Sequence, residues 1–143
     1  MNAGLVQKGE LMLERWEKAL SNHKRGYNCA QSVVCAYCDL FDIEEKTAFR
    51  IAEGFGLGMG SMGTCGAVAA MSMIVGMKES DGNLEKPTTK KVCYKKMKQL
   101  SNEFEKKNGS LICSEIKGVD TGVVLRSCNG CMEDACKLLD EYL

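Results

Sequence analysis

The chain has 143 residues, enough for one domain with an ordinary hydrophobic core, and its 19 basic residues balance 19 acidic ones. Because its lysine-rich stretch, 86–98, lacks repeated interleaving of aromatic residues and holds only Tyr94, we do not expect it to bind nucleic acid. The nine cysteines are an odd number and too few for a disulfide-rich scaffold. They favour metal binding or catalysis in a reducing compartment.

Neither a signal peptide nor a membrane anchor is expected. Charged residues interrupt the apolar residues of 1–20, so this segment lacks the core of a signal peptide. The longest nearly apolar run, 67–77, is shorter than the roughly 20 residues that a bilayer requires. The sequence therefore predicts a cytoplasmic protein without a membrane partner.

Apolar residues recur at helical spacing in most segments, and the chain has a single proline, which predicts an all-α fold. The expected helices run over 5–26, 29–41, 45–54, 65–77, 88–108, 111–116 and 128–142. The helix over 65–77 is apolar on all sides, so we expect it to be buried at the centre. The prediction is one domain over 1–143, a bundle of about six helices.

Four predicted helices share a feature at their starts. A residue that can cap a helix precedes each of them, and a cysteine follows within the first turn. The caps are Asn28, Thr64, Ser110 and Ser127, and the cysteines are Cys29, Cys65, Cys113 and Cys128. Unpaired backbone N–H groups and the helix dipole stabilise a thiolate there, and the thiolate is the form that binds metal or attacks disulfides.

Four thiolates brought together suit an iron–sulfur cluster or a tetrahedral zinc ion, and these residues alone do not distinguish the two. Pairs of the same thiols also suit thiol–disulfide chemistry. Cys131 competes with Cys128 for the fourth place, because the two form a CxxC motif that opens a helix. Any single cysteine can instead be a small core residue.

The remaining cysteine motifs predict less. Cys35 and Cys38 form a second CxxC motif without a preceding strand, and we expect them on a half-exposed helix surface. Neither CxxC motif is followed by histidine, so covalent haem attachment is excluded. His23, the one histidine, lies in a polar stretch and is expected in a solvated loop.

A glycine-rich segment precedes Cys65. Residues 58–63 match the GxGxxG pattern, but the segment before them is expected to be helical, which excludes a dinucleotide site. We expect the backbone here, with Gly63 and Gly66, to pass close to a bound cofactor and to offer it N–H donors. Close packing of helices is the other interpretation of these glycines.

The stretches 28–33, 58–67 and 112–113, together with Cys128 before the last helix, resemble the C-GCAxxG-C-C family of redox-active proteins. The resemblance covers about 27–143 and implies a helical fold with a redox role. Its motif places Cys29, Cys65 and Cys113 at the family's cysteines, with Cys128 preferred over Cys131 as the fourth. A related domain in split-Soret cytochromes c carries an iron–sulfur cluster, so the resemblance implies that cluster here. Ala70 stands where the family's motif has glycine.

The resulting prediction is a redox or electron-transfer protein in which Cys29, Cys65, Cys113 and Cys128 bind an iron–sulfur cluster. The alternatives are a thiol–disulfide oxidoreductase or redox sensor, and a structural zinc or small-ligand binding protein. A redox partner is expected but not identified by the sequence. The apolar helix faces also allow a homodimer.

Overall fold

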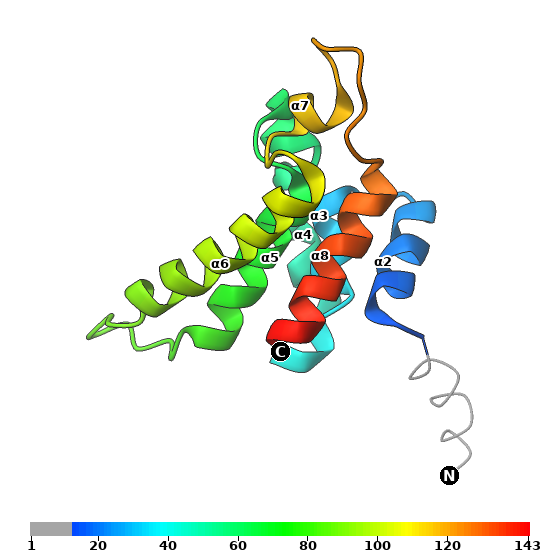
Figure 1. Cartoon of the computed structure of the whole chain (residues 1–143). Helices are drawn as coiled ribbons and strands as arrows, with labels where there is room; N and C mark the ends of the chain where they lie inside the picture. The colour runs from blue at the N-terminus through cyan, green and yellow to red at the C-terminus, as the bar shows by residue number, and fades with distance from the viewer. Residues whose placement is uncertain (1–12) are drawn as a thin grey trace.

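The structure of the protein, a computed structural model, describes residues 13–143 (Figure 1). Within this range it contains helices, turns and one isolated bridge but no strand, which confirms the all-α prediction. The α-helices are α2 (Arg15–Lys24), α3 (Cys29–Cys35), α4 (Glu45–Ala52), α5 (Gly66–Glu79), α6 (Lys90–Asn108), α7 (Cys113–Lys117) and α8 (Cys128–Tyr142). Three shorter helical segments lie between them: η1 (Cys38–Phe41), η2 (Glu53–Phe55) and η3 (Gly58–Met62).

The short helix α3 lies at the centre of the bundle and contacts α2, α4, α5 and α8 (Figure 1). Every residue from 30 to 35 is buried, and most of these side chains are small, which lets four helices approach one. Helix α5 packs on α3, α6 and α8. Its predicted burial on all sides is wrong in part, because Ser72 and Lys78 are exposed.

Two of the four predicted helix caps are formed as expected. The Asn28 side chain accepts a hydrogen bond from the backbone N–H of Gln31 (2.9 Å). In turn, the Gln31 side-chain oxygen accepts one from the backbone N–H of Asn28 (2.9 Å). The Ser127 hydroxyl accepts from the backbone N–H of Gly130 (3.0 Å) at the start of α8. These local hydrogen bonds satisfy amide groups that a helix start leaves unpaired.

The predicted first helix begins at Arg15 in the structure, and its expected positions Leu5 and Met12 lie outside the described residues. The predicted helix over 29–41 ends at Cys35 and continues as the separate turn η1, which stops at Asp42 in a left-handed conformation (φ 53°). None of the helices in the described part of the chain is long and apolar enough to cross a membrane.

Candidate functional site

A cavity of about 350 Å³ lies where four helices begin, and five cysteines line it. Cys29, Cys113 and Cys128 are the first residues of α3, α7 and α8, and Cys65 is the residue that precedes α5. The fifth cysteine is Cys131, one turn into α8. The structure thus brings together all four predicted cysteines and the contested fifth.

A short antiparallel bridge places Cys65 and Cys113 side by side. The Cys65 amide donates to the Leu111 carbonyl (2.8 Å), and the Cys113 amide donates to the Gly63 carbonyl (2.6 Å). Between them, Thr64 pairs with Ile112. This bridge uses Thr64 in pairing rather than as the predicted cap, so Cys65 itself becomes the capping residue of α5.

The two motif glycines act on the backbone that carries the cysteines. A methyl group at Gly66 would lie 3.1 Å from the Ala30 amide nitrogen and 3.2 Å from Cβ of Cys29, so glycine allows α5 to start against α3. Gly63 accepts the hydrogen bond from Cys113. Neither glycine lines the cavity of the described residues, so the structure gives them a positioning role, and their expected contact with a cofactor stays a prediction.

The sulfur atoms form two hydrogen-bonded pairs. A hydrogen bond from the Cys29 thiol, aided by the positive charges of Lys117 and His23, lowers the pKa of Cys128 to about 6. A hydrogen bond from the Cys131 thiol, with the backbone N–H groups of Ala67 and Val68, lowers the pKa of Cys65 to about 7.

The donor thiols shift in the opposite direction. The pKa of Cys29 is raised by its hydrogen bond to Cys128, and that of Cys131 is raised by its hydrogen bond to Cys65. Burial raises the pKa of Cys113, and no hydrogen bond to another thiol contributes to this shift. At neutral pH the pair of Cys29 and Cys128 therefore holds a thiolate, the pair of Cys65 and Cys131 is about half ionised, and Cys113 is protonated.

Positively charged and polar side chains also line the cavity. His23 lies in α2 and is half buried against the cavity, so its predicted place in a solvated loop is wrong. Lys117 lies at the end of α7, and Arg126 pairs with Asp134 through two contacts of 3.1 and 3.3 Å. Of these side chains, Lys117 and His23 help to lower the pKa of Cys128, and Leu57 and Ile116 make the site partly apolar.

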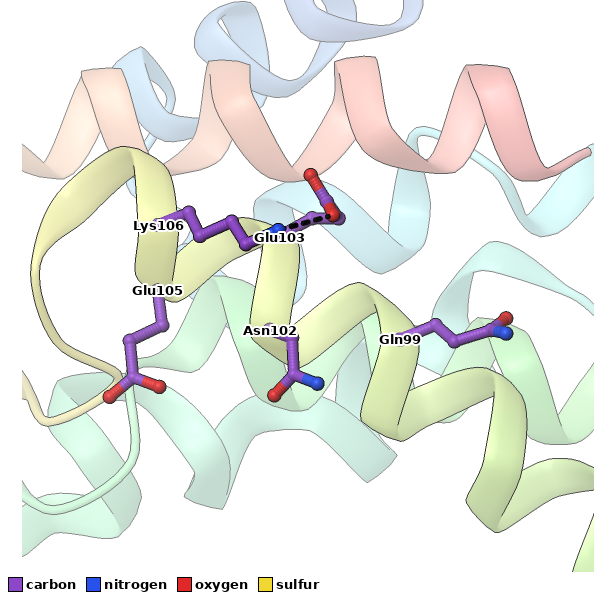
Figure 2. A pocket seen from close by; sticks show the side chains of 5 residues that line it. All are labelled: Gln99, Asn102, Glu103, Glu105 and Lys106. Atoms are coloured by element: carbon purple, nitrogen blue, oxygen red, sulfur yellow. Dashed lines mark hydrogen bonds and ion pairs between the residues drawn. The ribbon is translucent and has the colours of Figure 1, made fainter.

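The other cysteines lie elsewhere. Cys35 and Cys38 are 8% and 7% exposed, so their prediction as a half-exposed surface is wrong. Another hollow, of about 580 Å³, lies along α6 between polar side chains, where Lys106 pairs with Glu103 (Figure 2). It shares no residue with the cysteine cavity and contains no thiol.

The site can be compared with what a metal requires. Among residues 13–143, no three histidine, cysteine, aspartate or glutamate side chains are grouped to hold a single metal ion. The donors nevertheless have the chemistry of an iron–sulfur site, because such clusters are held by cysteine thiolates and five thiols face one cavity. The cysteines present fit a cluster or a tetrahedral zinc ion by chemistry and number, and the choice between the two stays a prediction.

Sequence reasoning did not find the partnership of Cys131 with Cys65 or the place of His23. The only available signal for Cys131 was its spacing of three residues from Cys128, which puts both on one face of α8.

Comparison with known proteins gives one match. The model of a family described as "Putative redox-active protein (C_GCAxxG_C_C)" matches residues 27–142. No curated protein and no solved structure matches the chain.

Proposed function

The chain belongs to the C-GCAxxG-C-C family of redox-active proteins, and on this premise we propose that it transfers electrons through an iron–sulfur cluster bound by Cys29, Cys65, Cys113 and Cys128. The observation that supports this proposal is the convergence of four helix-start thiols on one cavity. A bound cluster would accept or donate one electron at a time.

The chain's own residues supply the conditions for such a ligand set. Helix starts present N–H groups to the sulfur atoms, and the Cys65 sulfur already accepts from two of them. Lys117 and His23 offset negative charge near Cys128. The low exposure of Cys65 and Cys113, 7% and 8%, limits the access of water to the site.

Anaerobic purification followed by iron and sulfide analysis and visible spectroscopy tests the proposal. Replacement of any of the four ligands by serine should abolish cluster binding, whereas Cys131→Ser and the distant control Cys93→Ser should retain it. A colourless wild-type protein that also resists reconstitution with iron and sulfide would contradict the proposal. Loss of the cluster in Cys131→Ser but not in Cys128→Ser would show that Cys131, rather than Cys128, is the fourth ligand.

The two hydrogen-bonded thiol pairs favour thiol–disulfide exchange as a second candidate function. A thiolate at Cys128 or Cys65 could attack a disulfide, and its partner, Cys29 or Cys131, could then close an internal disulfide. Mass spectrometry after mild oxidation should find Cys29 linked to Cys128 and Cys65 linked to Cys131. The absence of both links would eliminate this candidate.

A further inference from the structure

Cys35 and Cys38 line a second cavity, of about 370 Å³, which shares no lining residue with the cavity of five cysteines. Lys18 of α2, Arg25 directly after α2, and Glu45 at the start of α4 also line this second cavity. The CxxC motif therefore has its own opening for a ligand.

Both thiols of this motif are held close to one backbone turn. Cys38 Sγ donates to the Cys35 carbonyl (3.4 Å), and Cys35 Sγ donates to the Glu45 carbonyl (3.8 Å). Side chains three residues apart on a helix have Cβ atoms about 5–6 Å apart, whereas a disulfide needs about 3.5–4.5 Å. Because α3 ends at Cys35, regular helical geometry does not fix the position of Cys38, so a small shift of Cys38 is enough to form the disulfide.

Tyr37, between the two cysteines, fixes the turn to the core. Its side chain is 1% exposed, and its hydroxyl lies within hydrogen-bond distance of two acceptors, the Cys136 carbonyl (2.9 Å) and Asp140 Oδ1 (2.7 Å), which share its one proton. With Tyr37 anchored on α8, both neighbouring cysteines remain at the wall of the second cavity.

The charges around this cavity favour an anionic ligand. Arg15 neutralises one of its two acidic residues, Asp39 (2.5 and 3.1 Å). The other, Glu45, accepts from the neutral Tyr27 hydroxyl (2.7 Å) and keeps its charge, so the two cations outnumber it by one. Lys18 and Arg25 line the same space, and Arg25 donates only to the neutral side chain of Asn22 (2.6 Å) among the described side chains. Two cations are thus placed to meet a carboxylate.

We propose that Cys35 and Cys38 are a second redox dithiol, which reduces a small carboxylate-bearing disulfide in the cavity beside α2. One thiol loses its proton to solvent, and because burial raises the pKa of both Cys35 and Cys38, this deprotonation limits the rate at neutral pH. The deprotonated sulfur attacks the disulfide, which releases one small thiolate that takes up a proton. The other cysteine then attacks the mixed disulfide, releases the second small thiol and loses its own proton. Two cysteine thiols are oxidised to one Cys35–Cys38 disulfide, and one small disulfide is reduced to two thiols.

The test is anaerobic incubation of the reduced full-length protein with glutathione disulfide, which carries carboxylates, and in parallel with cystamine, which is cationic. Alkylation and peptide mapping then follow the tryptic segment 26–46, with Cys29→Ser as the background so that only Cys35 and Cys38 remain in it. We expect this segment to lose two hydrogens and both alkylation sites together, as a Cys35–Cys38 disulfide requires. At low ionic strength glutathione disulfide should react roughly tenfold faster than cystamine, because the cations beside the cavity attract its carboxylates.

Matched variants separate the steps. In Cys35→Ser the remaining Cys38 should stop at a mixed disulfide with glutathione, and Cys93→Ser should behave as the parent does. Lys18→Met should slow the reaction with glutathione disulfide and leave the cystamine rate unchanged. Unchanged helical circular dichroism shows that each variant is folded.

Two results would overturn the proposal: full alkylation of both Cys35 and Cys38 after either disulfide, or a link from either of them to a different cysteine. Equal rates with the two disulfides would refute the preference for carboxylates. Iron and sulfide content measures the cluster of the proposed function independently of Cys35 and Cys38, so failure of one proposal does not imply failure of the other.

Discussion

The two thiol sites lie at opposite ends of one short helix, and the comparison shows how the position of a cysteine controls its chemistry. At the start of α3, Cys29 donates to Cys128 and helps to lower the pKa of that thiol to about 6. At the end of α3, burial and the neighbouring Cys38 raise the pKa of Cys35 to about 12. Both cysteines of α3 are themselves thiols, since the pKa of Cys29 is raised as well. The difference lies in their neighbours: Cys29 donates to a thiolate at the start of another helix, whereas Cys35 is buried beside a second thiol and Glu45.

The largest expected effect is a difference in reactivity between the two sites. In the reduced, metal-free protein at pH 7, iodoacetamide should alkylate Cys128 more than about 100-fold faster than Cys35, because only the thiolate reacts. Between pH 8 and pH 5 the Cys128 rate should fall with a midpoint near its pKa of about 6, since protonation removes the nucleophile. Quantitative mass spectrometry of the alkylated peptides measures both rates. Similar rates for the two thiols at pH 7 would remove the distinction between the sites.

The next effect concerns the stability of the CxxC end. Tyr37→Ala should lower the free energy of unfolding by about 3–5 kcal/mol, because it removes a fully buried ring and leaves a cavity. Tyr37→Phe keeps the ring and loses the hydrogen bonding of the hydroxyl, so it should cost only about 1 kcal/mol. Urea unfolding followed by circular dichroism measures both. Equal losses in the two variants would show that the hydroxyl, rather than the ring, holds this turn.

A smaller effect is expected where α3 and α5 meet at the cysteine cavity. Gly66→Ala should destabilise the fold by about 1–3 kcal/mol, because the added methyl group would crowd the backbone of Ala30 and Cβ of Cys29. Gly76→Ala is the matched control on the same helix. An added methyl there meets no atom within 4 Å, so helix propensity should stabilise the fold by about 0.5–1 kcal/mol. Thermal unfolding that ranks the two variants in the opposite order would contradict the close approach at Gly66.

The smallest effect tests the cations beside the cavity. Lys117→Met should raise the pKa of Cys128 by a fraction of a unit, because Lys117 is half buried and solvent screens part of its charge. The alkylation midpoint of Cys128 should therefore move to higher pH. Lys137→Met is the control, since Lys137 is exposed and paired with Glu133 (2.7 Å). An equal shift in both variants would mean that net charge, rather than position, sets the pKa.

The parts of the structure that the sequence predicts well are those fixed by neighbouring residues. Asn28 and Ser127 cap helices through side-chain hydrogen bonds to residues three positions away, so their spacing alone reveals where α3 and α8 begin. Gly118 ends α7 in a left-handed conformation (φ 71°), as the glycine rule predicts. Because Cys29 and Cys128 adjoin two of these signals, the sequence alone predicts their place at helix starts.

The features that the sequence predicts poorly depend on residues far apart in the chain. Thr64 pairs with Ile112 instead of capping a helix, and no local pattern marks that choice. The burial of Cys35 follows from the packing of α3 against four helices, although helical periodicity alone places it on an outer face. His23 faces the cavity because of how α2 meets the rest of the bundle. Each of these outcomes is decided by tertiary contacts.

The location of Cys128 and Cys131 in α8 has a consequence for biosynthesis. The cavity combines the start of α3 with the start of α8, the last helix of the chain. During translation the earlier cysteines leave the ribosome without the partners that acidify or shield them, and they gain those partners only when α8 docks. Loading of a cofactor, or formation of the internal disulfides, is therefore expected only after α8 has been synthesised and has docked. Oxidants or stray metals have their best access to these thiols before that point.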